Sequence, residues 1–420
     1  MIRRPDGGPL RNLDGTTMTS FLHSADWQLG KPFARITDEE QRGRVQRERL
    51  EAVRRIGDLV RERKASFVVV AGDLFDSATP KDATISHALA AIGSIGVPVY
   101  AIPGNHDHGG PDSLWERPFY RRQREAVAPN FHILLERQPV ERDDAVLLPC
   151  PLLRRHEPDD PTSWLRRWEP AEGDQRPRIV IAHGSVRAFG GAALGNSVDG
   201  EEAGQANAID LGRLPLDKLD YIALGDWHGF LNVGEKAWYS GAHEIDRFPK
   251  ADQRPGHVAA VTVSRGGLSV VEALPTGKLR WLRHEVTLGE DGPGVLNRIL
   301  RAATGSRYDD CLVELVLTGA VSLADRSRLD TLLADWRAGL VRLDLDDGVR
   351  LAPSEEEMRA LTERPDPIIS RVAAELVARK DAGGEGAAVA LAALRLLHGF
   401  CRDASDGGTS QPQERRHEAS

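Results

Sequence analysis

The sequence predicts an α/β fold: a layered core of β-sheets flanked by helices, then a small α/β unit and C-terminal helices. Three observations support this prediction. Short apolar stretches alternate with longer segments whose apolar residues recur at helical spacing. The apolar stretches contain no polar break, as expected for strands that a parallel sheet buries on both faces. Most of them end in a polar turn that contains Asp, Asn or His.

The first part of the chain shows the order strand–helix–strand–helix–strand. Its long helix is indicated by Val53, Ile56 and Val60, which recur at helical spacing. This order is typical of a layered α/β domain, because a crossover helix can connect two parallel strands. In chain order we expect a strand at 20–26, a helix at 38–64, a strand at 67–71, a helix at 83–95 and a strand at 97–103.

The middle of the chain continues with shorter elements. A loop rich in Gly, Ala and Asn at 189–208 is long enough to form a lid or rim of a site. We expect a helix at 114–127 and strands at 131–135, 146–149, 178–182 and 219–224. Four further segments are expected to be antiparallel strands that close the domain: 237–240, 257–263, 268–274 and 279–288.

Changes of pattern divide the chain into regions. Residues 1–18 are polar, lack the apolar core of a signal peptide and are predicted to be a disordered extension. The last helix, 386–400, is apolar almost all round, so either the protein buries it or a partner covers it. The predicted regions are a main domain at 19–288, a small α/β domain at 289–350, a helical region at 351–403 and a disordered tail at 404–420.

Composition narrows the classes of protein. Three widely spaced cysteines without a CxxC argue against a disulfide framework and favour a reducing cytoplasm. No apolar run approaches about 18 residues, so no membrane span is expected. The net charge of −8 argues against a protein that coats DNA by charge alone, but it allows a local basic groove. Arginine runs at 35–64 and 117–124 are either such a groove or the solvated faces of helices.

The polar turns after the strands contain the residue types that hold divalent metal ions. Because the carboxyl ends of parallel strands meet at one edge of a sheet, side chains there converge. Carboxylates, imidazoles and amide oxygens suit manganese, magnesium or iron, and the lack of thiolates disfavours a structural zinc site. Trp27 and Trp227 either line this site or pack in the core. The candidate residues are Asp26, Gln28, Asp73, Asp76, Asn105, His106, Asp107, His183, Asp226 and His228.

These turns, in this order, resemble the motifs of the calcineurin-like metallophosphoesterases. The resemblance covers about residues 19 to 286. Within that superfamily the chain looks most like the SbcD-type nuclease subunits, the DNA-repair exonucleases that work with an SbcC-type ATPase. The small α/β unit, which takes the place of a DNA-capping domain, favours this subgroup. The matching blocks are Leu22-His-Ser-Ala-Asp-Trp-Gln-Leu-Gly30, Gly72-Asp-Leu-Phe-Asp76, Gly104-Asn-His-Asp107, Ala182-His-Gly184 and Gly225-Asp-Trp-His228.

The resemblance implies a metallophosphoesterase core with two divalent metal ions bridged by Asp73. Two such cations lower the pKa of a water between them and offset the charge that develops on the phosphate. Around the bridge, the resemblance assigns Asp26, Gln28 and His228 to one ion and Asn105, His183 and Asp226 to the other.

The resemblance also implies a general acid, and the chain departs from the family's motif at two positions. His106 would contact the scissile phosphate or protonate the leaving oxygen, with the Asp76 carboxylate orienting its ring. The family has histidine where this chain has Gln28 and Asp226. Gln28 offers a neutral amide oxygen, and Asp226 offers an anionic one. This shift toward oxygen ligands predicts Mn²⁺, or Mg²⁺, over zinc, and it puts full metal occupancy in question.

The sequence therefore predicts a cytoplasmic, metal-dependent phosphodiesterase that hydrolyses DNA as an exonuclease or endonuclease in repair or end processing. The expected partners are DNA, an SbcC-like ATPase and a second copy of the chain, with no membrane. Two alternatives stay open. One is a phosphodiesterase on small nucleotides, and the other is a weakly active or inactive scaffold subunit of a repair or defence complex. His23, His108 and His243 lie near the motifs and are expected to be structural.

Overall fold

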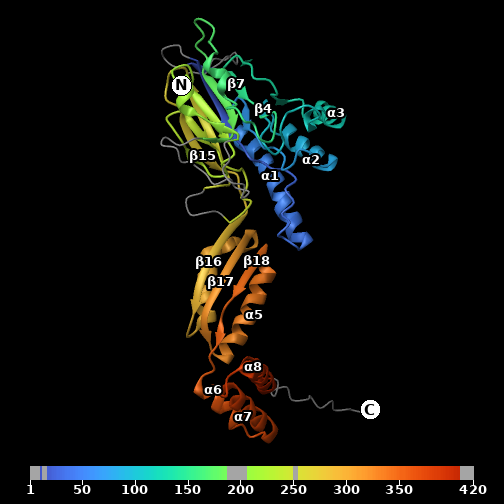
Figure 1. The fold of residues 1–420 in the computed structure, drawn as a ribbon, viewed down its shortest axis with the longest axis vertical. Helices are drawn as coiled ribbons and strands as arrows, with labels where there is room; N and C mark the ends of the chain where they lie inside the picture. The colour runs from blue at the N-terminus through green and yellow to red at the C-terminus, as the bar shows by residue number, and fades with distance from the viewer. Residues whose placement is uncertain (1–9, 12–16, 187–205, 249–253, 407–420) are drawn as a thin grey trace, which may run out of the picture. The chain divides into compact units, whose positions relative to one another are not determined.

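The computed structural model describes residues 10–11, 17–186, 206–248 and 254–406 (Figure 1). The chain divides into two units, Met1–Arg280 and Trp281–Ser420, and each is described by itself. The predicted α/β class is confirmed, because both units contain multi-stranded sheets and helices. None of the described helices is long and apolar enough to cross a membrane.

The first unit contains two large sheets. In the first sheet the strand order is β15-β14-β2-β3-β4-β5, and β1 pairs with β2. Strands β2 to β5 are parallel, whereas β14 is antiparallel to both β2 and β15. The bounds are β1 Leu10–Arg11, β2 Thr17–Ser24, β3 Val68–Ala71, β4 Val99–Ile102, β5 Phe131–Ile133, β14 His257–Ser264 and β15 Val270–Pro275.

The second sheet has the order β12-β13-β11-β8-β7-β6. Its four central strands, β7, β8, β11 and β13, are parallel. A separate pair, β9 and β10, lies beyond the end of β8. The bounds are β6 Val140–Glu141, β7 Val146–Cys150, β8 Arg178–His183, β9 Ser185–Val186, β10 Ala208–Ile209, β11 Tyr221–Gly225, β12 Leu231–Asn232 and β13 Ala237–Tyr239.

Strand β3 shows why the apolar stretches have no polar break. Val68 and Val70 belong to a core that includes residues of α1 and α2. Val69 and Ala71, on the opposite face of the strand, pack with Ile181 of the second sheet. Both faces are therefore covered. The helices and 3₁₀ turns of this unit are α1 Glu39–Arg63, α2 Asp82–Gly93, η1 Leu114–Glu116, α3 Pro118–Val127, η2 Ser163–Arg166 and η3 Leu211–Arg213.

The second unit combines a small sheet with helices. Its strand order is β16-β17-β18, and β19 pairs with β17. One apolar core joins α4, α5 and this sheet, and a second joins α6, α7 and α8. The bounds are β16 Arg280–Leu288, α4 Gly292–Thr304, η4 Gly305–Asp310, β17 Cys311–Val321, α5 Leu323–Gly339, β18 Arg342–Asp347, β19 Arg350–Leu351, α6 Glu355–Thr362, α7 Pro367–Asp381 and α8 Glu385–Asp406.

Several predicted elements differ from the structure. Strand β13 is parallel to β11, not an antiparallel closing strand, and β16 joins the sheet of the second unit. Part of the extension predicted to be disordered is a strand, because Leu10 pairs with Met18 of β2. Helix α6 lies in the predicted helical region, where no separate helix was assigned to it, and it begins at a capping box formed by Ser354 and Glu357. The predicted loop at 189–208 lies almost entirely outside the described residues, and the proposed domain boundaries stay a prediction.

Candidate metal centre

The predicted site residues gather at the carboxyl ends of strands from both sheets of the first unit. Asp26 follows β2, Asp73 follows β3, and His183 is the last residue of β8. The register of β8 and β11 places Gly225 opposite His183, so the turn that follows β11 begins beside this histidine. The sheets therefore bring together residues that are about 200 positions apart, as the main-chain N–H of Asp226 shows by donating to Asp26 Oδ1 at 3.0 Å.

The turns that carry these residues have unusual backbone conformations. Positive φ angles are rare for residues other than glycine and cluster at functional sites. Two glycines permit close approach: a Cβ on Gly72 would lie 2.3 Å from His183 Nδ1, and a Cβ on Gly104 would lie 2.0 Å from Asp73 Oδ1. The site residues with positive φ are Asp26 (55°), Gln28 (40°), Asp73 (55°) and Asp226 (104°).

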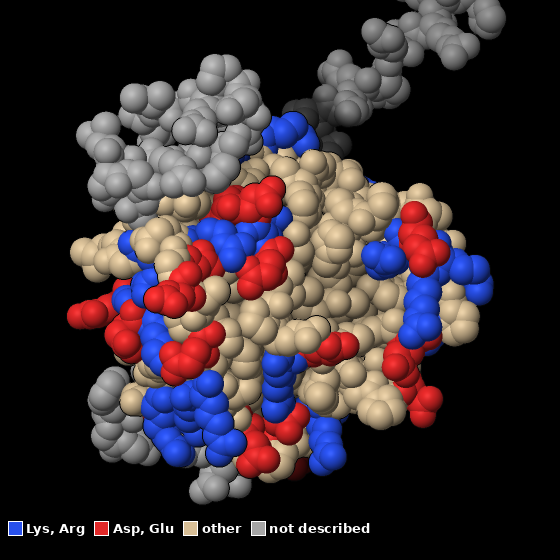
Figure 2. Space-filling view, turned by 90° about the horizontal axis from the view of Figure 1, so that it is seen from above, with Lys and Arg blue, Asp and Glu red and all other residues tan. Residues whose placement is uncertain are grey.

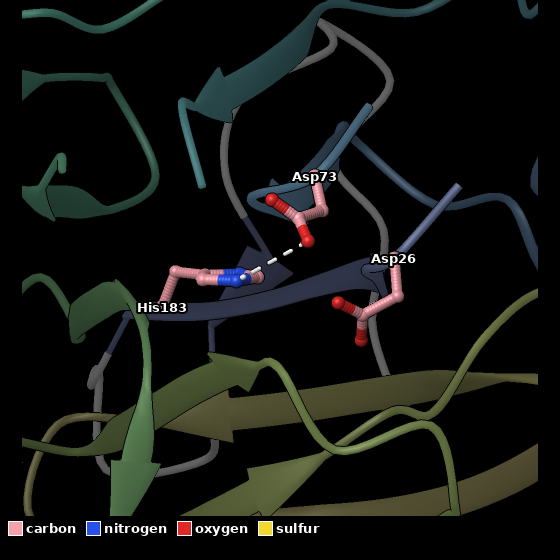
Figure 3. Close-up of side chains that lie close together, drawn as sticks. All are labelled: Asp26, Asp73 and His183. Atoms are coloured by element: carbon pink, nitrogen blue, oxygen red, sulfur yellow. Dashed lines mark ion pairs between the residues drawn. The ribbon is translucent and has the colours of Figure 1, made fainter. Parts of the chain in front are cut away.

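Three buried side chains form the centre of the site. Asp26, Asp73 and His183 each offer one ligand atom, and these atoms all lie within 4.8 Å of one another (Figure 3). His183 Nε2 is 3.6 Å from Asp73 Oδ2. Its Nδ1 lies 2.8 Å from the carbonyl oxygen of Ala71, so that contact fixes the ring and turns Nε2 toward the carboxylates.

Two further predicted ligands surround His183 Nε2. Asn105 Oδ1 is 2.9 Å away, and Asp226 Oδ1 is 4.0 Å away. Asp226 is about one-third exposed and accepts a hydrogen bond from the Ser185 hydroxyl at 2.6 Å. The structure therefore brings Asp73, Asn105, His183 and Asp226 together.

The electrostatics of this centre call for a cation. The pKa of Asp26 is raised to about 6, chiefly by burial; His228 and His183 lower it, and the nearby carboxylates of Asp73 and Asp226 raise it. Burial would lower the pKa of His183, but the carboxylates of Asp73, Asp26 and Asp226 raise it to about 9. The carboxylates thus favour positive charge at the position their oxygens surround. Buried carboxylates, an imidazole and an amide oxygen are a donor set that fits a divalent metal ion.

His106 lies at the edge of the centre. Its main-chain N–H donates to Asp73 Oδ1 at 3.0 Å, and its Nε2 is 3.9 Å from Asp73 Oδ2. The ring is 17 % exposed, so a substrate can reach it. Asp76 contacts this ring through its main chain: His106 Nδ1 lies 2.9 Å from the carbonyl oxygen of Asp76. A carbonyl oxygen accepts only from N–H, so this contact places the Nδ1 proton and leaves Nε2 toward Asp73.

The other side of the predicted centre is arranged differently. Gln28 Oε1 accepts a hydrogen bond from Lys31 Nζ at 2.8 Å. Lys31 Nζ also pairs with Asp246 Oδ2 at 2.8 Å, and that oxygen lies 3.4 Å from His228 Nδ1. Burial alone would raise the pKa of Asp246, but His228, Lys31 and Arg49 hold it well below its ordinary value. In the described part of the chain, His228 lies outside the group of three that converges on Asp73.

Sequence reasoning missed three residues that support the site. Asp246 and Lys31 belong to no motif, and their roles arise from tertiary contacts. Arg49 is fully buried in α1 and donates to three carbonyl oxygens: Nε to Trp27 at 2.5 Å, Nη2 to Asp26 at 2.8 Å and Nη1 to Glu244 at 3.0 Å. The available signal was its spacing: Arg49 follows Val45 by four residues and precedes Ala52 by three, which places it on the apolar face of α1.

Two residues named from the motifs have structural roles. The Asp107 carboxylate is buried and accepts from the main-chain N–H groups of Leu74, Phe75 and Gly104, so it joins the turns after β3 and β4. Trp27 is fully buried and donates to the Ser24 hydroxyl at 2.7 Å, which makes it a core residue. Trp227 is half-buried.

Part of the chain matches a known protein family. Residues 19–230 match the family described as calcineurin-like phosphoesterase. The matched span covers half of the 420-residue chain and contains all nine predicted metal-site and catalytic residues.

Proposed function

The chain belongs to the calcineurin-like phosphoesterases, and from this premise we propose that it is a metal-dependent phosphodiesterase that cleaves DNA. Membership of the family makes it a phosphoester hydrolase. The observation that carries the proposal is the group formed by Asp26, Asp73 and His183, with His106 beside it. The choice of DNA as substrate is the further step proposed here.

The residues of the centre suit hydrolysis of a phosphodiester. When bound, divalent cations supply a water of lowered pKa and offset negative charge on the phosphate. Asp73 lies between His106 and His183: its Oδ1 accepts from the His106 main-chain N–H, and its Oδ2 faces the His183 ring. The Asp76 carbonyl oxygen accepts the Nδ1 proton of His106, so in the doubly protonated ring it is the Nε2 proton that would pass to the leaving oxygen.

We propose Mn²⁺ as the working ion, with Mg²⁺ as the alternative. The chemistry of the donors supports this choice. Asp26, Asp73, Asn105 and Asp226 supply oxygen, and His183 supplies nitrogen. Among the described residues, the group of possible ligands includes no cysteine. A mostly oxygen-based donor set favours manganese or magnesium over zinc.

A basic loop beside the centre supports a nucleic-acid substrate. Residues 152–157 begin beside the turn that carries His106, where the Gly109 N–H donates to the carbonyl oxygen of Leu152 at 2.9 Å. They end at Asn207, whose N–H donates to the carbonyl oxygen of Glu157 at 2.8 Å. Asn207 in turn packs against Gly184, which follows His183. The exposed residues Arg154, Arg155 and His156 therefore lie on a loop that runs from the turn of His106 to the end of the strand that carries His183.

The other arginine-rich segments contribute unequally. On α1, arginines pair with acidic residues of the same helix, as Arg42 does with Glu39 and Arg61 with Asp58. On α3, Arg121 and Arg122 are exposed. Figure 2 likewise shows Lys and Arg in separate clusters interleaved with Asp and Glu on one face. Phosphate binding is therefore assigned to local clusters rather than to one continuous basic surface.

Exposed apolar residues on the C-terminal helices favour binding of a protein partner, which we propose to be an SbcC-like ATPase. Helix α8 buries Ala390 and Leu394, but Val389, Leu396 and Phe400 are each more than 60 % exposed. These three residues recur at helical spacing and form one apolar stripe. Replacing Leu396 and Phe400 by Asp should abolish co-purification of the ATPase and leave a folded chain. Self-association of the full chain that the same replacement abolishes would assign the stripe to a homodimer instead.

One assay tests the proposed function. End-labelled double- and single-stranded DNA is incubated with Mn²⁺ and the wild type, His106→Ala or Asp73→Ala, with exposed His87→Ala as the matched control. We expect the wild type and the control to degrade DNA and both site variants to lose this activity. If the wild type hydrolyses cyclic nucleotides and leaves DNA intact, the substrate is a small nucleotide and the DNA proposal is wrong.

A further inference from the structure

Lys31 places a fixed positive charge beside Gln28, the position at which the resemblance implies a metal-binding histidine. Its Nζ donates to Gln28 Oε1 and to Asp246 Oδ2, both at 2.8 Å. The side chain is only 18 % exposed, and Asp246 is buried. The Lys31 ammonium is thus held by two oxygens at a site that faces both the ligand turn and His228.

The backbone around Lys31 is also fixed. The Lys31 N–H donates to the carbonyl oxygen of Gln28 at 3.2 Å, and its own carbonyl oxygen accepts from Gln46 Nε2 at 2.9 Å. Asp246 additionally accepts from Arg247 Nε at 3.0 Å. The ammonium is therefore preorganised, and it does not depend on a flexible surface side chain meeting a partner by chance.

This arrangement disagrees with Gln28 as an ordinary metal ligand. The Gln28 amide has a single oxygen, and the ammonium occupies one of its acceptor positions. A metal ion on the same oxygen would lie close to the ammonium and would be repelled by it. A histidine at this position would offer a ring nitrogen to the metal and no acceptor oxygen to Lys31. The two sides of the centre are therefore unequal, because within the described residues no Lys or Arg side chain contacts Asp73, Asn105, His183 or Asp226.

We propose that Lys31 acts as a built-in cation of this centre, so that the chain holds one metal ion tightly and a second only weakly. Gln28 is then a positioning residue for Lys31 and not a metal ligand. The tightly held ion lies with Asp73, Asn105, His183 and Asp226. The weak position is the one beside Asp26 and His228. This inference rests on the proposed metal-dependent function of the same centre.

Metal binding by the full chain tests the proposal without relying on activity. The protein is stripped with a chelator, titrated with Mn²⁺ by calorimetry, desalted and analysed for retained metal. Electron paramagnetic resonance then distinguishes an isolated Mn²⁺ ion from an exchange-coupled pair. The variants are Lys31→Met, which keeps the length and removes the charge, and the double variant Gln28→His with Lys31→Met. Lys81→Met, at an exposed position, is the matched control, and circular dichroism checks folding.

The wild type and the control should retain one ion per chain and give the signal of an isolated ion. Lys31→Met should tighten the second binding step by about ten-fold or more, the scale of a change next to a ligand. The double variant should retain two coupled ions. Two tightly bound, coupled ions in the wild type, or no effect of Lys31→Met, would overturn the inference and leave the proposed function standing. Failure of the wild type to bind any Mn²⁺ would overturn both.

Discussion

His106 and Asp73 are joined through both the main chain and the side chain: the His106 N–H donates to Asp73 Oδ1 at 3.0 Å, and His106 Nε2 lies 3.9 Å from Asp73 Oδ2. The residue proposed to move a proton is thus positioned by the residue proposed to bridge the metals. Replacing Asp73 should affect metal binding, whereas replacing His106 should not, because only Asp73 converges with Asp26 and His183.

Replacing His106 should affect the reaction but not metal binding. We expect His106→Ala to lower kcat for a DNA or model phosphodiester about 100- to 10,000-fold, the usual contribution of a general acid. Mn²⁺ retention should stay as in the wild type, whereas Asp73→Asn should lose both activity and metal. Steady-state kinetics and metal analysis of the desalted proteins measure the two effects. Equal loss of metal in both variants would show that His106 is a ligand.

Removing the Arg49 side chain should destabilise the first ligand turn. Arg49 is buried, and its three donors satisfy the carbonyl oxygens of Asp26, Trp27 and Glu244. Arg49→Met would leave these oxygens without their donors, so we expect the free energy of unfolding to fall by about 3 kcal/mol. Urea unfolding of the metal-free protein measures this. Arg47→Met on the exposed side of α1 is the control and should change stability by less than about 0.5 kcal/mol.

The Asp107 carboxylate should be required to hold two ligand turns together. It accepts from Gly104 and Leu74 at 2.8 Å and from Phe75 at 3.1 Å. An amide has one acceptor oxygen and would direct N–H groups at one of these donors, so Asp107→Asn should cost about 1–3 kcal/mol of unfolding free energy. It should also weaken Mn²⁺ retention. Asp112→Asn, at an exposed position in the same loop, should do neither, and equal stability of the two variants would contradict the assigned role.

Arg154 should contribute to DNA affinity through charge. It is exposed beside the centre and has no hydrogen bond or ion pair within the described part of the chain. In a His106→Ala background, which prevents cleavage, Arg154→Gln should weaken binding of labelled DNA across sequences and reduce the salt slope by about 1. Fluorescence anisotropy at several salt concentrations measures both. Arg47→Gln is the charge-matched control, and an unchanged slope in Arg154→Gln would remove the loop from the proposed DNA surface.

The sequence predicted the strands and ligand turns because their signals are local. Unbroken apolar runs such as Val68–Ala71 reflect burial on both faces, and parallel strands bring their carboxyl ends together without further information. The direction of β13 and the sheet that β16 joins depend on pairing between distant strands, which no local pattern encodes. The Lys31–Asp246 pair joins residues 215 positions apart and was missed for the same reason.

Buried His23 should make stability fall as the pH falls. Burial lowers its pKa from 6.5 to about 3, although the contact of Nε2 with the Leu224 carbonyl oxygen raises it slightly. Above pH 6.5 the ring is neutral in both the folded and the unfolded chain, and its stabilising contribution is complete. Below pH 6.5 His23 binds a proton in the unfolded chain, but in the folded chain it stays neutral until about pH 3. Between pH 7.5 and 5.5 this one group should therefore cost about 1.4 kcal/mol of unfolding free energy.

His243, which is also buried with a lowered pKa, should add a similar loss in the wild type. His23→Gln should remove only the part of this pH-dependent loss that is due to His23. The stability of the variant should therefore fall less steeply than that of the wild type over the same pH range, whatever the variant's stability at pH 7.5. Urea unfolding at several pH values in the presence of a chelator measures this slope without metal binding. Exposed His87→Gln should keep the wild-type slope. If His23→Gln also keeps it, His23 takes up its proton in the folded chain, and its burial next to Tyr221 does not exclude charge.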